Sequence, residues 1–280
     1  MANLGFLAAL GAALAWGSYM VPFKKSRNSN LTQFQALMAA GIGFSGLLIS
    51  LVLGFPLSFN LYGLASGVLW ATANMVALIA ISSLGLARAV PVISSLIIVS
   101  SFLWGALIFN ELTSGLLVGF SGIGLIIFGV ILISAIGNTG SKNIKKGLLA
   151  TVLAGVIWGS QWVPLKMGNT NALNLFFPVC FGIFFSGLIF FVVKRTEFKR
   201  EAIAESLLSG LVWNVGNLLS LISLSIIGSS KMGPISQVAT LVAVLWGLFY
   251  FKEVTNKKAR IQVLIGAVIL LAGVATLAFA

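Results

Sequence analysis

The sequence has no histidine, a single cysteine and only five acidic residues among its 280 positions. Because Cys180 stands alone and histidine is absent, the chain can form neither an internal disulfide nor a Cys/His cluster, which argues against structural zinc and haem. Charged residues make up 8% of the chain, whereas soluble domains carry roughly 25%. Together with 59% hydrophobic residues and a mean hydropathy of +1.10, this scarcity of charge excludes a water-soluble fold.

The usual signatures of enzyme sites are also missing. The chain has no nucleophile with a histidine partner, no metal-ligand spacing and no glycine loop that could cradle a phosphate. No acidic residue lies in the middle of an apolar segment, which disfavours an antiporter of protons and cationic drugs, since such a protein needs a buried carboxylate. We therefore expect a protein that is not an enzyme and that uses no cofactor.

Long apolar runs, by contrast, are abundant. A bilayer core of about 30 Å requires about 20 apolar residues per helix, and ten segments fit. The expected spans are 3 to 23, 31 to 53, 61 to 82, 89 to 109, 115 to 136, 147 to 166, 172 to 193, 204 to 226, 232 to 251 and 261 to 280. We expect the first to be a retained helix and not a signal sequence, because its pattern recurs around Trp158. The predicted fold is an all-α membrane protein.

The two halves of the chain repeat each other. Trp16-Gly17-Ser18, Val21-Pro22 and Lys24 recur 142 positions later as Trp158-Gly159-Ser160, Val163-Pro164 and Lys166. The other matches keep offsets of 141 to 143: Phe44-Ser45-Gly46-Leu47 with Phe185-Ser186-Gly187-Leu188; Ser66-Gly67, Trp70 and Asn74 with Ser209-Gly210, Trp213 and Asn217; Gly85, Arg88 and Pro91 with Gly228, Lys231 and Pro234; Trp104-Gly105, Phe109 and Glu111 with Trp246-Gly247, Phe251 and Glu253. Because each half has an odd number of helices, the second copy must be inverted in the membrane. The sequence predicts a five-helix repeat over 1–140 and a second, inverted five-helix repeat over 141–280.

The basic residues provide an independent test of this topology. The net charge is +12, but the basic residues lie between apolar segments, so they indicate topology and not a nucleic-acid partner. Of the 17 basic residues, 15 lie in or beside the odd-numbered connections: Lys24, Lys25, Arg27, Arg88, Lys142, Lys145, Lys146, Lys194, Arg195, Lys199, Arg200, Lys252, Lys257, Lys258 and Arg260. The positive-inside rule puts these connections in the cytoplasm and both termini outside.

Several of these motifs also resemble a known family. They are Trp16-Gly17-Ser18; Gly210-Leu211-Val212-Trp213-Asn214-Val215-Gly216-Asn217; Pro234-Ile235-Ser236-Gln237 followed by Phe251-Lys252-Glu253; and Leu86-Ala87-Arg88-Ala89-Val90-Pro91-Val92-Ile93-Ser94, which approximates an Arg-x-x-Pro-Ile-Ser pattern. With them the chain resembles the EamA-like ten-helix transporters of the drug/metabolite transporter superfamily, and within it the glucose/ribose uptake branch. The resemblance implies a prokaryotic cell-membrane protein. It also implies a central cavity lined mainly by helices 1, 3, 4, 6, 8 and 9, and alternating access of the two repeats.

Polar side chains within apolar helices are the first candidates for a solute site, because they are costly there without a partner. The candidate amides are Asn74, Gln161, Asn214, Asn217 and Gln237. Amides both donate and accept hydrogen bonds, as sugar hydroxyls do, and tryptophan rings can cover the apolar face of a sugar. The four candidate rings are Trp16, Trp70, Trp158 and Trp213. A structural interpretation is also open: the amides could bond neighbouring helices and the tryptophans could form interfacial belts.

Two matched cations and two matched prolines leave further alternatives. Arg88 and Lys231 could snorkel to the interface or, if they face the cavity, bind anions or gate it. Pro91 and Pro234 could be ordinary helix starts or could mark irregular turns at the cavity. The matched glutamates, Glu111 and Glu253, are expected in loops at the interface.

The leading hypothesis is a permease for a small neutral polar solute, most simply a monosaccharide, with the lipid bilayer as its environment. The alternatives are an exporter of amino acids or other metabolites, a sugar-phosphate or anion exchanger, and a membrane scaffold or sensor without transport. The small residues Gly115, Gly119, Gly122, Gly266 and Gly273 could serve internal helix packing or a homodimer.

Overall fold

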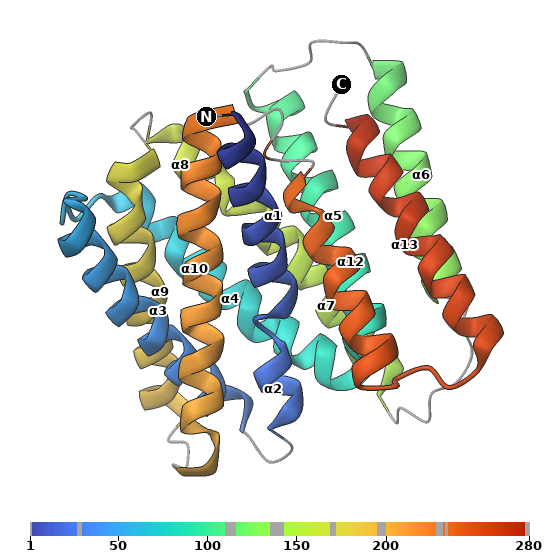
Figure 1. The fold of residues 1–280 in the computed structure, drawn as a ribbon, viewed down its shortest axis with the longest axis horizontal. Helices are drawn as coiled ribbons and strands as arrows, with labels where there is room; N and C mark the ends of the chain where they lie inside the picture. Colours follow the sequence, from blue (N-terminus) through green and yellow to red (C-terminus); the bar gives the residue numbers. More distant parts are fainter. Residues whose placement is uncertain are drawn as a thin grey trace.

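The computed structural model describes residues 2–26, 30–109, 116–134, 143–168, 172–194, 200–227, 232 and 235–277. All regular structure within these ranges is helical, and they contain no strand. Figure 1 shows a bundle in which α1 begins and α13 ends at the same end. This arrangement requires an even number of crossings between them.

The described helices range from five residues in α2 to 25 residues in α10. In chain order they are α1 (Ala2–Ser18), α2 (Val21–Lys25), α3 (Leu31–Leu53), α4 (Leu61–Leu84), α5 (Leu86–Leu107), α6 (Leu116–Ser134), α7 (Ile144–Ser160), α8 (Trp162–Met167), α9 (Ala172–Lys194), the 3-10 turn η1 (Arg200–Ala202), α10 (Ile203–Ile227), α12 (Val238–Leu245), the π-helix η2 (Trp246–Tyr250) and α13 (Lys257–Leu277). Among the described residues, eight helical segments are long and apolar enough to cross a membrane, counting α1 with α2 and α7 with α8. Two shorter apolar helices, Leu117–Ile133 and Val238–Tyr250, lie within the two other expected spans.

The first span of each half is broken near its end. α1 stops at Ser18 and α2 resumes with Pro22 in its first turn, while α7 stops at Ser160 and α8 resumes before Pro164. A proline inside a helix removes one backbone hydrogen bond and clashes with the carbonyl four residues earlier, so the break falls where the ring would meet the preceding turn. The two breaks occupy matched positions in the two halves.

The start of α5 differs from the expected boundary. The helix begins at Leu86 and not at residue 89, so Pro91 lies inside it and not in its first turn. The interpretation of Pro91 as an ordinary helix start is therefore wrong. The reason is tertiary: the carboxylate of Glu253 accepts hydrogen bonds from the backbone N–H groups of Leu86 and Ala87, which stabilises one additional turn.

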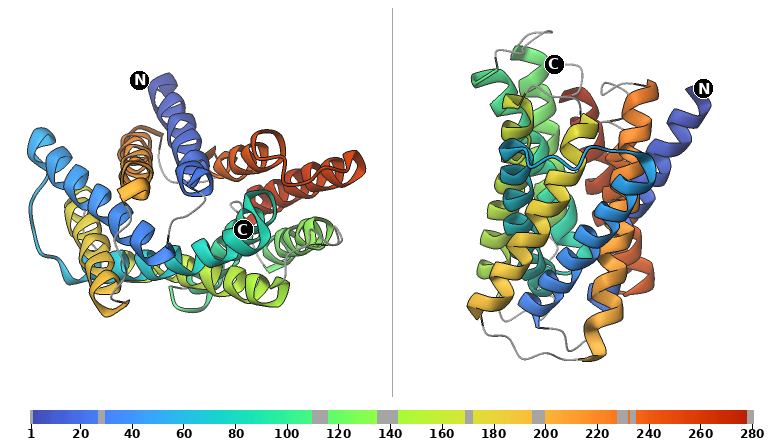
Figure 2. Two further views of the ribbon diagram at one scale, coloured as in Figure 1. Left: turned by 90° about the horizontal axis from the view of Figure 1, so that it is seen from below. Right: turned by 90° about the vertical axis from the view of Figure 1, so that its left-hand side faces the viewer.

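Packing pairs elements of the first half with elements of the second. α3 packs against α9 and α10, α4 against α7 and α9, α1 against α10 and α12, and α5 against α7. Figures 1 and 2 place α6 and α13 together at one edge of the bundle, with α3 and α9 at the other. Gly266 and Gly273 on α13 contact the backbone of α6 at Gly129 and Gly122, so these small residues serve packing within the chain.

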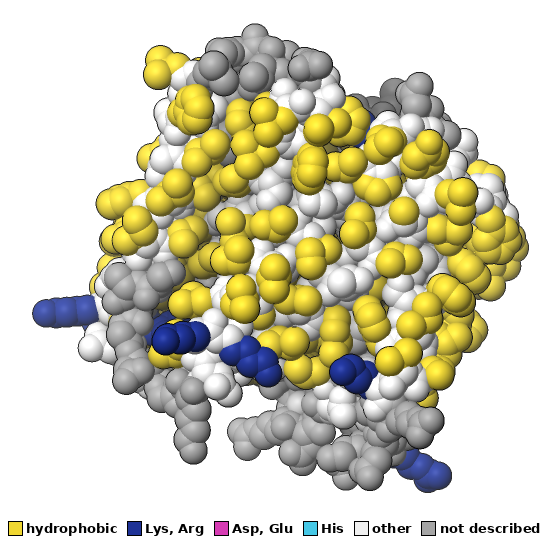
Figure 3. Space-filling view, turned by 180° about the vertical axis from the view of Figure 1, so that it is seen from behind, with side chains coloured by type: hydrophobic (Ala, Val, Ile, Leu, Met, Phe, Trp, Pro, Cys, Tyr) yellow, Lys and Arg dark blue, Asp and Glu magenta, His cyan; other side chains and the backbone are white. Residues whose placement is uncertain are grey.

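The outer surface is apolar over most of its height. Figure 3 shows one face covered by hydrophobic side chains, with Lys and Arg side chains gathered along its lower edge. Leucine, valine and phenylalanine side chains on the outside of α3, such as Phe44 and Val52, are 69% and 73% exposed. An exposed apolar belt of this kind requires lipid around it.

Candidate functional site

Three tryptophans from three helices meet in the main core of the bundle. The ring centroids of Trp70 on α4 and Trp213 on α10 are 4.5 Å apart, and those of Trp70 and Trp158 on α7 are 5.9 Å apart. All three side chains are buried. Trp70 and Trp213 are matched residues of the two halves, so their contact lies where the halves meet. Trp16, the fourth tryptophan expected at the site, is partly buried against the same core.

Two of these tryptophans carry a donor that nothing in the described part of the chain satisfies. The indole N–H groups of Trp16 and Trp158, which are matched residues, are buried and without a hydrogen-bond partner there. A buried donor without an acceptor costs about 1–3 kcal/mol. Gly216 on α10 makes room for one of them, because a Cβ at this position would lie 2.8 Å from the Trp16 indole nitrogen.

A second matched pair of tryptophans shows the contrast. The indole of Trp104 donates to Ser160 Oγ over 2.9 Å, and that of Trp246 donates to Ser18 Oγ over 2.9 Å. Each bond joins one half of the chain to the other at the break in the first span. Indoles whose role is to join helices are therefore satisfied in this protein, which marks Trp16 and Trp158 as different.

Asn74 lies at the centre of a hydrogen-bond chain. Its Oδ1 accepts from the Tyr19 hydroxyl over 3.2 Å, and its Nδ2 donates to Gln35 Oε1 over 2.6 Å. Gln35 Nε2 in turn donates to the Ala71 carbonyl over 3.3 Å. Tyr19 and Gln35 were not among the residues expected from the sequence. Gln35 had the same signal as the others, an amide inside an apolar span, whereas Tyr19 follows the Trp-Gly-Ser motif directly.

Asn214 holds three helices together. Its Nδ2 donates to Ser45 Oγ over 2.8 Å and to the Ile42 carbonyl over 3.3 Å, and its Oδ1 accepts from the Cys180 thiol over 3.6 Å. The side chain is fully buried. In this conformation its donors and its acceptor are engaged by α3 and α9.

The three remaining amides are half-buried, and two of them lie where helices break or begin. Gln161 lies between α7 and α8, Gln237 directly precedes α12, and Asn217 lies one turn beyond Trp213 on α10. No hydrogen bond of these side-chain amides is seen within the described ranges. They are therefore able to bind a solute without breaking a bond of the fold.

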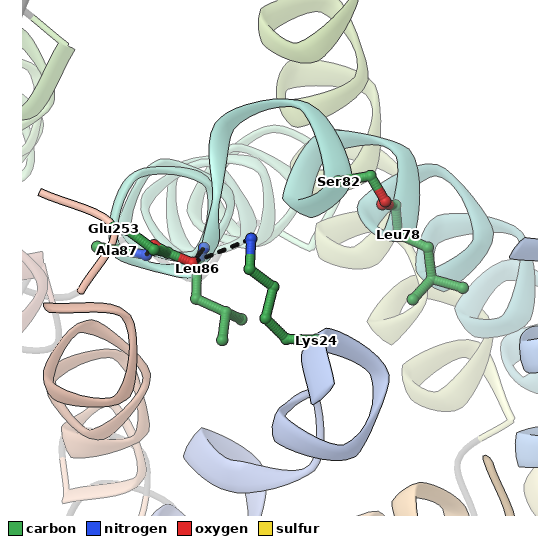
Figure 4. Close-up of polar contacts among 6 residues, drawn as sticks. All are labelled: Lys24, Leu78, Ser82, Leu86, Ala87 and Glu253. Atoms are coloured by element: carbon green, nitrogen blue, oxygen red, sulfur yellow. Dashed lines mark hydrogen bonds and ion pairs between the residues drawn. The ribbon is translucent and has the colours of Figure 1, made fainter. Parts of the chain in front are cut away.

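Arg88, one of the two expected cations, lies in the first turn of α5, near the charge of Glu253. Figure 4 shows Lys24 and the Glu253 carboxylate, with their ion pair drawn. Lys231, Pro234 and Glu111 lie outside the described residues. Among the residues that the structure describes, no group of three or more His, Cys, Asp or Glu side chains could hold a metal ion.

Comparison with known proteins gives concordant matches over the whole chain. The profile of the family described as "Sugar transport protein" matches residues 7–280. The "Glucose uptake protein GlcU" of Bacillus subtilis is 26% identical, with 99% of each chain covered. The "Glucose uptake protein GlcU" of Staphylococcus xylosus is 27% identical, with 95% of each chain covered. One solved crystal structure has the same fold, with a TM-score of 0.61, 16% identity and 98% of each chain covered.

Proposed function

Because the chain belongs to the sugar transport protein family, it is a multi-pass sugar permease of the bacterial cell membrane, and we propose that it moves a monosaccharide by alternating access. Ten spans would form two inverted five-helix repeats, residues 1–140 and 141–280, with the solute between them. Glucose is the first candidate, since the relatives from Bacillus subtilis and Staphylococcus xylosus are named for glucose uptake.

The inverted repeat is supported by helix contacts that occur in matched pairs. In each pair, the helices of the first half and those of the second half swap roles. α1 packs against α12 as α5 packs against α7, and α1 packs against α10 as α4 packs against α7. The side chains repeat this exchange, since Trp104 bonds Ser160 and Trp246 bonds Ser18. Two inverted copies around a common axis would give this pattern, and alternating access would move one copy against the other around the solute.

The observation that carries the sugar site is the pair of unsatisfied indole donors. Trp16 and Trp158 each bury an N–H group without an acceptor in the described chain, in the same core as the contacting rings of Trp70 and Trp213. A sugar supplies what is missing, because its hydroxyls accept hydrogen bonds and its C–H face packs on aromatic rings. Indoles carry no net charge, so such a site favours a neutral solute.

The amides would complete the site from both halves. Asn74 contributes through its bonds with Tyr19 and Gln35, while Asn217, Gln161 and Gln237 have amides that a sugar could engage directly. Asn214 would act by fixing the helix that carries Trp213 and Asn217. Arg88 and Lys231 would matter only for an anionic solute.

The orientation follows from the charge distribution. The end of the bundle that carries Lys24, Lys145, Lys252 and Lys257 would face the cytoplasm by the positive-inside rule. The start of α1 and the end of α13 lie at the opposite end and would face outward. The first repeat then enters from outside and the second from inside.

Counterflow in proteoliposomes tests the proposal. The purified protein is reconstituted in separate vesicles loaded with unlabelled glucose, ribose, an amino acid or a sugar phosphate, and the entry of the same labelled solute is measured in each. We expect glucose or ribose flux, and we expect Asn217→Ala to lower it at least about tenfold, as loss of two hydrogen bonds to a solute would.

The outcomes separate the alternatives. No flux of any solute from well-folded protein would favour a scaffold or sensor, and flux of an amino acid alone would favour an exporter of metabolites. Flux of the sugar phosphate alone would favour anion exchange through Arg88 and Lys231. Sugar flux that survives Asn74→Ala combined with Asn217→Ala unchanged would show that the solute binds elsewhere.

A further inference from the structure

One carboxylate joins three elements at the end of the bundle where the basic residues gather. Glu253 Oε1 accepts from the Leu86 N–H over 2.9 Å, and Oε2 accepts from the Ala87 N–H over 2.8 Å. Lys24 Nζ lies 3.2 Å from Oε1. Figure 4 shows Lys24 reaching from α2 toward this carboxylate at the start of α5. Glu253 therefore caps α5 and pairs with α2 at the same time.

The backbone around Glu253 is shaped for this contact. Gly85, the residue before α5, has φ +84°, and a Cβ there would lie 2.6 Å from Glu253 Oε2. A Cβ at Gly247 would lie 2.6 Å from the Ala87 nitrogen. Lys252 has φ +51°, the one positive φ outside glycine among the described residues. The left-handed backbone of Lys252 turns the chain after η2. Because Gly85 and Gly247 have no side chain, the Glu253 carboxylate can reach the backbone N–H groups of Leu86 and Ala87.

The Lys24–Glu253 ion pair joins the two halves of the chain at a polar contact, whereas Ala87 in the first turn of α5 belongs to a buried apolar cluster with Val244, Leu248 and Val254. Lys24 and the first turn of α5 belong to the first half, and Glu253 belongs to the second. The Lys24 and Glu253 side chains are 28% and 11% exposed, so water reaches the pair at the edge of the bundle. The Lys24–Glu253 ion pair can separate at low cost, because water can hydrate both charged groups once they are apart.

We propose that Lys24, Glu253 and the first turn of α5 form a latch that holds the permease closed at the end carrying the basic residues and that opens once in each transport cycle. The proposal rests on the alternating access proposed above. Opening separates Lys24 from Glu253, while Glu253 keeps its hydrogen bonds to the Leu86 and Ala87 amides. The pair controls access to the solute site and does not bind the solute.

Reversible cross-linking tests whether the contact must open. The variant carries Lys24→Cys and Glu253→Cys, and its native Cys180 is fully buried and so shielded from reagent. A bismaleimide linker with a cleavable disulfide joins the two thiols in proteoliposomes, and glucose counterflow is measured before linking, after linking and after reduction. We expect linking to lower counterflow at least about tenfold and reduction to restore it, since a closed end blocks half of the cycle.

The controls keep this test separate from that of the proposed function. Two control variants carry only one of the two substitutions, either Lys24→Cys or Glu253→Cys. They receive the same reagent and are expected to keep the flux that they show without it. Counterflow by the unlinked protein establishes transport; its absence there would count against the proposed function before the latch is tested. Full counterflow by the linked protein would overturn the latch and leave a static structural ion pair.

A second measurement avoids the loss of the Glu253 carboxylate. Spin labels at Lys25→Cys and Thr255→Cys, both exposed positions beside the pair, report the separation of α2 from the segment after η2. We expect Lys24→Gln to raise the population with the longer distance between the labels about threefold to tenfold, because this substitution removes the ion pair with Glu253. Glu205→Gln, which removes a charge on α10, serves as the control. Identical distance distributions with Lys24 and with Gln at this position would contradict the proposal.

Discussion

The three asparagines expected at the site differ in what surrounds their amides. Asn214 is engaged by α3 and α9, Asn74 is engaged by Tyr19 and Gln35, and Asn217 has no side-chain bond within the described ranges. A buried amide with satisfied groups stabilises the helices it joins, whereas one that can still bond is available to a solute. Residue type and burial in an apolar span are therefore insufficient to distinguish these roles.

At the same scale, tryptophan-to-phenylalanine exchanges separate binding from packing. Trp16→Phe and Trp158→Phe remove an unsatisfied donor and keep an aromatic ring, so we expect little loss of stability but a rise in the KM for sugar of about fivefold to twentyfold, the worth of one hydrogen bond to the solute. Counterflow at graded sugar concentrations gives the KM.

The matched controls are Trp104→Phe and Trp246→Phe, which remove a bond to Ser160 or Ser18. We expect them to lower the free energy of unfolding by about 1 kcal/mol. A thiol-reactive dye that detects the exposure of Cys180 on heating measures this, since Cys180 is the single cysteine and is fully buried. An unchanged KM in both Trp16→Phe and Trp158→Phe would rule out the indoles as sugar ligands.

The elements depend on close crossings at matched glycines. A Cβ at Gly67 on α4 would overlap the Val179 carbonyl of α9, and a Cβ at Gly210 on α10 would overlap the Met38 carbonyl of α3. Because the obstacle is backbone in each case, a methyl group must push the helices apart. The two crossings are related by the repeat, which gives the glycines a common physical cause.

Alanine at these crossings is therefore expected to destabilise the fold. Gly67→Ala and Gly210→Ala should each lower the free energy of unfolding by about 1–3 kcal/mol, the usual range for overpacking. Gly124→Ala on α6 is the control, because nothing lies within 4 Å of a Cβ there, and helix propensity favours alanine by about 0.5–1 kcal/mol. Equal unfolding temperatures for Gly67→Ala and Gly124→Ala in the Cys180 assay would contradict the close crossing.

For the whole molecule, the distribution of charge predicts the orientation in the membrane. The lower edge in Figure 3 carries Lys and Arg side chains, and the positive-inside rule places such an edge in the cytoplasm. We expect alkaline phosphatase fused after Ala280 to be active and green fluorescent protein fused there to be dark. The opposite pair of results would invert the assignment and place the latch on the outer face.

The sequence by itself determined the membrane class and the approximate place of eight spans, because apolar length and charge bias are local properties of the chain. It also identified the tryptophans that meet in the core. Only the tertiary structure decided that Asn214 is engaged by its neighbours, that Tyr19 and Gln35 surround Asn74, and that Glu253 caps a helix that begins 167 residues earlier. These facts depend on which helices pack together and at what height, and no spacing within a single helix contains that information.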